Sequence, residues 1–176
     1  GTPLVLVHGY SCSRAAWWWQ RRRLEAAGFT VATLSLEPIY ADIETYLPVL
    51  SQRIDAVLTK TGARQVALVG HSMGGLLARS ACHHAAAHDH GWLGSLRNLV
   101  CMGSPHQGAP LERGGRWIDL VLGATPFAAP LARVGKLRSA GITDLRHGNA
   151  LSTHRRHRQV SLPKGVRCYA MAATTG

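Results

Sequence analysis

The chain has 176 residues, 46% of them hydrophobic, which suffices for one domain with a sizeable core, and it contains no apolar run of about 18 residues that could span a membrane. Its net charge is +11, yet the basic residues are scattered apart from clusters at 21–23 and 155–158, and no aromatic residues interleave with these clusters as stacking platforms. We therefore expect a solvated, arginine-rich surface and no nucleic-acid partner, while a binding module for an anionic polymer or membrane surface is the alternative.

Strands and helices alternate over the first hundred residues, which is typical of an α/β fold with a parallel sheet and helices on both faces. The predicted strands cover residues 4–8, 29–36, 66–69, 96–102 and 166–172. The predicted helices cover residues 14–27, 46–61 and 73–88. Ser11 or Ser13 is the expected N-cap of the first helix, Thr45 is that of the second, and Gly62 ends the second.

Three consecutive tryptophans, Trp17, Trp18 and Trp19, lie in the first predicted helix. Successive helical positions spread around the circumference, so these three side chains cannot all face one core. We expect at least one of them to be partly exposed or to lie under a neighbouring loop. The others either belong to the core or line a substrate cleft.

The segment 66–76 joins a short apolar strand to Gly70-His71-Ser72-Met73-Gly74, which fits the Gly-x-Ser-x-Gly pattern. This pattern places a serine on a sharp turn from a strand into a helix, and glycines two positions on either side remove Cβ atoms that would collide there. Small residues follow at Gly75, Ala78, Ala81 and Ala85, so the next helix can lie close to the sheet. Ser72 is the candidate nucleophile.

The first strand ends in His8-Gly9-Tyr10, and the fourth is followed by Gly103-Ser-Pro-His-Gln-Gly108. Together with residues 69–75, these pieces resemble the α/β-hydrolase superfamily, and within it the bacterial triacylglycerol lipases and esterases. The resemblance implies that the backbone N–H groups of Tyr10 and Met73 form an oxyanion hole, supported by the motif residues His8, Gly9, Gly70, His71, Gly74 and Gly75. It implies no cofactor and no metal.

Residues 104–164 are rich in Gly, Pro and Arg, and we interpret them as a cap or lid inserted into a single domain that spans residues 1–176. Their apolar side chains either line an acyl-chain pocket or cover the edge of the sheet. His106 lies in this stretch, and we interpret it as a residue that braces the site rather than as the catalytic base.

Four further histidines, His83, His84, His88 and His90, follow one another near the end of the third predicted helix. His84 and His88 have the spacing of a metal-binding pair, but no third ligand is evident, so we expect a polar helix end instead. The four cysteines, Cys12, Cys82, Cys101 and Cys168, lack Cys-x-x-Cys spacing and are expected to be buried free thiols.

In the superfamily, the acid and then the histidine of the triad follow the nucleophile late in the chain. Here no Asp or Glu follows Asp144, and no His follows His157. We expect a fragment that stops short of both groups and is inactive alone. An internal substitute such as His106 with Asp119 or Asp144, or an inactive scaffold used for binding, is the alternative.

The sequence thus predicts a serine hydrolase for carboxylic esters of small molecules or lipids, of the lipase or carboxylesterase type. Thioesterase, amidase or acyltransferase chemistry would leave the same motifs. No protein partner is implied, and contact with a membrane surface is compatible with the charge. Because the chain begins with Gly1, a secreted, periplasmic or cytoplasmic location stays open.

Overall fold

The structure is a computed structural model that describes residues 1–9, 13–38, 41–104 and 164–172. Its centre is a five-stranded sheet in the order β2-β1-β3-β4-β5, and every neighbouring pair of strands is parallel. The strands are β1 (Leu4–Val7), β2 (Val31–Thr33), β3 (Val66–His71), β4 (Leu96–Met102) and β5 (Arg167–Met171). The predicted α/β fold with a parallel sheet is confirmed.

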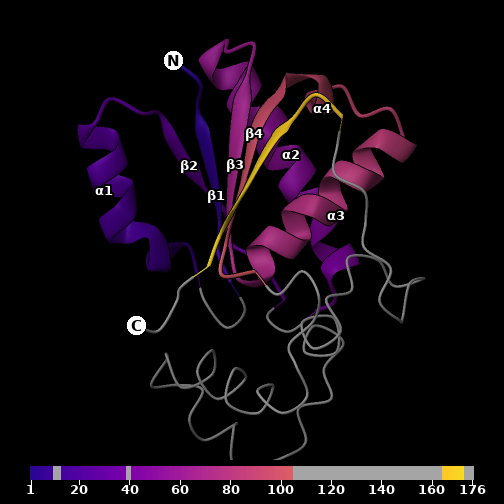
Figure 1. The fold of residues 1–176 in the computed structure, drawn as a ribbon, viewed down its shortest axis with the longest axis horizontal. Helices are drawn as coiled ribbons and strands as arrows, with labels where there is room; N and C mark the ends of the chain where they lie inside the picture. The colour runs from indigo at the N-terminus through magenta and orange to yellow at the C-terminus, as the bar shows by residue number, and fades with distance from the viewer. Residues whose placement is uncertain (10–12, 39–40, 105–163, 173–176) are drawn as a thin grey trace, which may run out of the picture.

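Helices lie on both faces of this sheet (Figure 1). A 3₁₀ turn (Arg14–Trp17) leads into α1 (Trp18–Ala26), which lies on one face. The helices α2 (Ile43–Thr61) and α3 (Met73–Ala87) cover the opposite face, and the short α4 (Trp92–Ser95) precedes β4. Within the described ranges, no helix has both the length and the apolar character that crossing a membrane requires.

The main core lies between the sheet and the α2–α3 layer. The central strands contribute Val5, Val7, Leu68 and Leu99, and the two helices contribute Leu50, Ile54, Leu76 and Leu77. The small residues of α3 are buried against the sheet, as their spacing predicts: Gly75, Ala78, Ala81 and Ala85. These faces are mostly apolar, although α2 also buries Ser51 and α3 buries Ser80, so burial of apolar surface is the main stabilising term of the domain.

The largest differences from the predicted bounds are in β2 and α2. The second strand covers three residues instead of eight, because it pairs only with the four-residue β1, from Leu4 opposite Val31 to Leu6 opposite Thr33. The helix α2 begins at Ile43, and its N-cap is Asp42 rather than Thr45. The Asp42 carboxylate accepts a hydrogen bond from the Thr45 backbone N–H at 2.8 Å. Thr45 is therefore the third residue of the helix, whose N–H the cap satisfies, and not the cap itself.

Other details agree with the sequence. Ser13 caps the 3₁₀ turn by accepting from the Ala15 N–H, and Gly62 ends α2 in the left-handed conformation with φ 63°. Among the tryptophans, Trp17 is buried, whereas Trp18 and Trp19 are 63% and 56% exposed, as expected for consecutive helical positions. The stretch predicted to be a cap falls outside the described residues, apart from its first and last positions.

Candidate active site

The strand order locates a reversal in the direction of the chain between β1 and β3. From β1 the chain moves outward to β2, whereas from β3 it moves the other way to β4 and β5. In parallel sheets of this kind, the crevice outside the carboxyl ends of the strands at such a switch point is the usual ligand site. His8 and Gly9 follow β1 there, and Ser72 follows β3. The sheet therefore brings together two motifs that lie more than sixty residues apart.

Ser72 stands at the tip of the turn between β3 and α3, as the sequence predicts. Its backbone has φ 55° and ψ −121°, a conformation that residues other than glycine rarely adopt. Its N–H donates to the Met102 carbonyl oxygen at 2.8 Å, and its own carbonyl oxygen accepts from the Gly75 N–H at 3.1 Å. Backbone groups of β4 and α3 thus hold this unusual conformation in place.

The Ser72 side chain is buried, with 2% of the residue exposed. Its Oγ has no hydrogen-bond partner within the described part of the chain. A buried hydroxyl without a partner costs about 1–3 kcal/mol, so such groups are rare in structural positions. Two features of Ser72 therefore lower the stability of the fold: its backbone conformation and its unpaired hydroxyl within the described chain.

The glycines of the motif are explained by close backbone approaches. A Cβ on Gly70 would lie 2.5 Å from backbone atoms of Gly74 and Gly75, and a Cβ on Gly74 would lie 2.3 Å from the Val7 carbonyl oxygen. Both distances are too short for a van der Waals contact, and the atoms that the added Cβ would meet belong to the backbone. The turn can close only because both positions lack a side chain.

Two other glycines bring further segments against the turn. A Cβ on Gly9 would lie 3.0 Å from the Ser72 Cβ, so the segment after β1 packs directly on the serine. A Cβ on Gly75 would lie 2.0 Å from Oγ of Ser104, the residue that follows the turn after β4. Ser104 was not singled out from the sequence, although it belongs to the quoted motif 103–108. Only the fold shows that it packs over the start of α3.

His8 is buried and both of its ring nitrogens are engaged. The Leu36 backbone N–H donates to Nε2 at 3.2 Å, so Nδ1 must carry the proton that it donates to the Gly9 carbonyl oxygen at 2.8 Å. Burial lowers the pKa of His8 from 6.5, while the hydrogen bond to Gly9 partly raises it. His8 is thus a neutral imidazole that ties the segment after β1 to the chain beyond β2.

His71, next to the serine, has a different environment. His71 is exposed, and its ring meets that of the buried Trp17 edge-to-face, with centroids 6.3 Å apart and an interplanar angle of 85°. Partial burial lowers the pKa of His71 from 6.5. The contact shows that the buried Trp17 packs against the residue that precedes Ser72.

Met73 is the first residue of α3 and is buried, so its N–H belongs to the first helical turn, where backbone donors have no partner within the helix. The helix dipole adds a partial positive charge at this end. Tyr10 and His106 lie outside the described residues, as does Cys12.

The histidines at the end of α3 form a cluster. The rings of His84 and His88 stack at 4.0 Å, and that of His90 meets His84 at 5.4 Å. The His88 Nδ1 donates to the His84 carbonyl oxygen at 2.9 Å, which satisfies one of the last carbonyls of the helix. Within the described ranges, no group of three or more His, Cys, Asp or Glu side chains is arranged to hold a metal ion.

The three cysteines within the described ranges are free thiols: Cys82 and Cys101 are buried and Cys168 is partly buried. Burial raises the pKa of the Cys82 thiol to about 12 and that of Cys101 to about 11. Both thiols therefore stay protonated at neutral pH and are poor nucleophiles.

A parallel sheet with a serine on a tight turn between a strand and a helix at the switch point defines the α/β-hydrolase fold. The chain belongs to the family described as the PGAP1-like alpha/beta domain, whose model matches residues 39–160. That match includes β3, Ser72 and α3. A comparison with curated proteins finds no significant match.

Solved structures support the fold. The chain is 22% identical to the mature form of the lipase BlEst2 from Bacillus licheniformis, with a TM-score of 0.67, over 96% of this chain and 64% of that one. It is 12% identical to a lipase-esterase related protein from Clostridium acetobutylicum, with a TM-score of 0.58, over 97% and 85% of the two chains. The chain thus spans slightly less than two thirds of the length of the Bacillus lipase.

Proposed function

We propose that this domain is a serine hydrolase that cleaves carboxylic esters, with Ser72 as its nucleophile. The observation that carries the proposal is the state of Ser72: a buried hydroxyl without a partner in the described chain, held at φ 55° at the switch point of the sheet. Both features destabilise the fold, and such costs are concentrated at functional sites. The lipase and the lipase-esterase related protein with the same fold agree with this proposal.

In the proposed reaction, Ser72 Oγ attacks the carbonyl carbon of the ester and loses its proton to a base. The carbonyl electrons move to the oxygen, which the N–H groups of Met73 and Tyr10 stabilise. Collapse of this intermediate expels the alcohol, which takes up the proton, and leaves an acyl group on Ser72. Water then attacks the acyl group, releases the acid and restores the serine.

The reaction requires a base that accepts the proton of Ser72. His8 is unsuited to the role because its two nitrogens are already bonded, and His71 makes no hydrogen bond to the Ser72 hydroxyl. We therefore assign the base to a histidine outside the described residues. The resemblance to lipases implies a histidine that follows the last strands, with an acidic residue before it, and His106 is the alternative.

Replacement of Ser72 by alanine tests the proposal. Full-length protein carrying Ser72→Ala should hydrolyse p-nitrophenyl butyrate at least about a thousandfold more slowly than the parent, because loss of a triad member leaves only residual catalysis. The matched control is Ser51→Ala, which removes a buried serine hydroxyl from α2, in the layer that covers the sheet. Parent-like hydrolysis by a folded Ser72→Ala protein would refute the nucleophile.

A further inference from the structure

The helix α1 differs from the other long helices because none of its residues is buried. It lies on the face of the sheet opposite α2 and α3 (Figure 1). Its first two residues are Trp18 and Trp19, which are 63% and 56% exposed. Adjacent exposed tryptophans form an apolar patch of the kind that marks interaction sites on protein surfaces.

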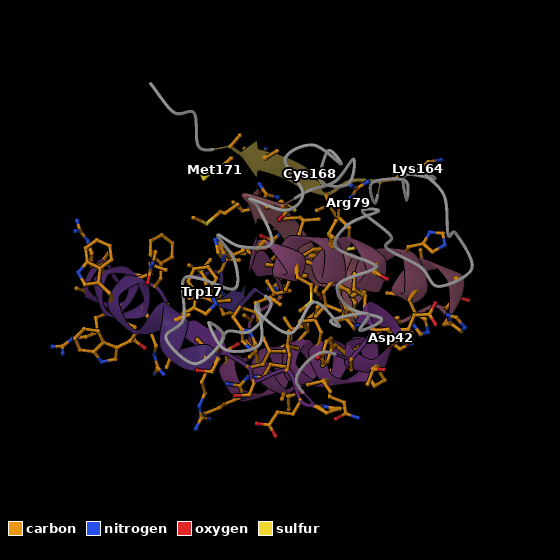
Figure 2. All side chains as sticks on the ribbon, turned by 90° about the horizontal axis from the view of Figure 1, so that it is seen from below. Trp17, Asp42, Arg79, Lys164, Cys168 and Met171 are labelled. Carbon is orange, nitrogen blue, oxygen red and sulfur yellow. The ribbon has the colours of Figure 1, made fainter. Side chains whose placement is uncertain are left out.

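Trp17, the residue before α1, shows which side of the helix is directed toward the sheet. Trp17 is buried and meets His71, so this position points toward the sheet, and Figure 2 shows it on the side of α1 that faces the rest of the molecule. Successive helical residues turn by roughly 100°, which directs Trp18 and Trp19 sideways and outward. One turn further on, Arg22 and Arg23 lie on the same side.

The structure pairs these four residues. The guanidinium of Arg22 lies 5.3 Å from the centroid of the Trp18 ring, and that of Arg23 lies 4.6 Å from the Trp19 ring. The four form one outward surface, which we call the Trp–Arg face. No aromatic residue lies between the arginines of the 21–23 cluster, but the helical i, i+4 spacing places Trp18 beside Arg22 and Trp19 beside Arg23.

Charge on this surface is largely uncompensated. Between residues 14 and 26 there are four arginines and a single acidic residue, Glu25. Glu25 pairs with Arg21 at 2.7 Å, and within the described ranges neither Arg22 nor Arg23 has a carboxylate partner. The Trp–Arg face is thus both aromatic and positively charged, on a chain whose net charge is +11.

We propose that the Trp–Arg face docks the domain onto an anionic lipid surface. Indole rings favour the boundary between headgroups and hydrocarbon, and arginines attract anionic headgroups while their stems lie along apolar surface. A nucleic acid is a poorer fit. It requires open indole faces in a groove that follows the backbone, whereas each indole here carries a guanidinium and a helix is convex.

The location of the face has a consequence for the site. Trp18 and Trp19 directly follow Trp17, whose ring contacts His71 next to Ser72. Docking through the first turn of α1 would bring the switch-point edge of the sheet near the lipid, where ester carbonyls of lipids lie. Binding itself does not depend on catalysis, so the docking proposal can fail or succeed independently of the proposed hydrolase function.

Sedimentation with vesicles tests the proposal directly. Full-length protein should bind vesicles of equal parts phosphatidylcholine and phosphatidylglycerol much more tightly than vesicles of phosphatidylcholine alone. The double variant Arg22→Gln/Arg23→Gln should bind the anionic vesicles about 30-fold more weakly, since each basic residue at such a surface contributes about fivefold. Trp18→Gln/Trp19→Gln should weaken binding at least about tenfold.

A matched control removes two charges elsewhere. Lys60→Gln/Arg64→Gln neutralises exposed residues at the end of α2 and before β3 and should change binding by no more than about twofold. Thermal melting of each variant checks the fold. Vesicle binding that is absent in the parent, or unchanged in both face variants, would overturn the proposal. So would binding to a single-stranded oligonucleotide, or self-association, that the Trp variant abolishes while vesicle binding persists.

Discussion

Gly74 in the first turn of α3 lies directly against Val7 at the end of β1, so closely that a Cβ on Gly74 would be 2.3 Å from the Val7 carbonyl oxygen. The same Cβ would lie 2.8 Å from the carbonyl oxygen of His8, the residue that follows β1. This approach brings the helix that begins after Ser72 next to the strand that leads to Gly9. Together with the packing of Gly9 on Ser72, this approach joins the two sequence motifs.

Replacing Gly74 with alanine should therefore be costly. The backbone on both sides must move, and we expect the free energy of unfolding to fall by about 1–3 kcal/mol or more, as in overpacked cores, with loss of ester hydrolysis. Gly94→Ala is the control, since a Cβ there meets nothing within 4 Å. Urea unfolding of both variants measures the difference. Equal stabilities would show that the approach of α3 to β1 is not tight.

Ser72→Gly should make the protein more stable while removing its activity. Glycine adopts φ 55° without strain, and the change also deletes a buried hydroxyl that has no partner in the described chain. Strain relief of about 1–3 kcal/mol, less the entropy of glycine at about 0.5–1 kcal/mol, leaves a net gain of about 1 kcal/mol.

The control for Ser72→Gly is Asp89→Gly at φ 52°, because aspartate tolerates the left-handed region and the gain should be near zero. Chemical unfolding followed by circular dichroism gives both values. A Ser72→Gly protein that is less stable than the parent would contradict the account of strain at this position.

The buried His8 should make stability depend on pH. Its folded pKa is lowered by burial, so the unfolded chain, with a pKa near 6.5, binds the proton more readily. The stability linked to His8 is fully present above about pH 6.5 and is lost as the pH falls toward the lower folded pKa, by up to about 1.4 kcal/mol per pH unit. His71 and His84, whose pKa values are also lowered, add contributions of the same sign.

His8→Asn should reduce this dependence. The variant should be less stable than the parent at pH 7 or so, because the Leu36 N–H and the Gly9 carbonyl lose their partner. Between roughly pH 6.5 and 5, its stability should fall less steeply than that of the parent. Parallel curves of unfolding free energy against pH would argue that His8 does not titrate in this range.

The two possible caps of α2 can be distinguished by mutation. Asp42→Ala should lower the free energy of unfolding by about 1 kcal/mol, because the Thr45 N–H loses its acceptor, whereas Asp42→Asn should retain most of the stability. Thr45→Ala should have a smaller effect, since its backbone N–H is kept. Thermal melting of the three variants checks the order. A larger effect at Thr45 than at Asp42 would favour the cap predicted from the sequence.

The sequence predicted best where one local pattern determines the structure. The bounds of β4 agree with the predicted 96–102, because the apolar stretch Leu99–Met102 ends at Gly103. The turn at Ser72 was predicted because its glycines allow few alternatives. The end of α2 at Gly62 followed for the same reason, since glycine readily takes φ 63°.

Predictions failed where distant segments determine the outcome. The length of β2 depends on the four residues that β1 offers for pairing, and no pattern within 29–36 shows this. The second hydrogen bond of the His8 ring comes from the N–H of Leu36, which is 28 residues away in the sequence. The contact of Ser104 with Gly75 appears only when β4 and α3 are brought together. The pairs Trp18–Arg22 and Trp19–Arg23, by contrast, follow from the i, i+4 spacing within one helix.

The measurement that tests the central claim most directly is covalent labelling of the nucleophile. Full-length protein is treated with a p-nitrophenyl alkylphosphonate, which reacts with an activated serine and stops at the stable adduct. Peptide mass spectrometry then locates the added group. We expect a single adduct on Ser72, and none on any residue in Ser72→Ala. An unlabelled Ser72 in a protein that hydrolyses esters, or an adduct on another residue, would contradict the assignment of Ser72 as the nucleophile.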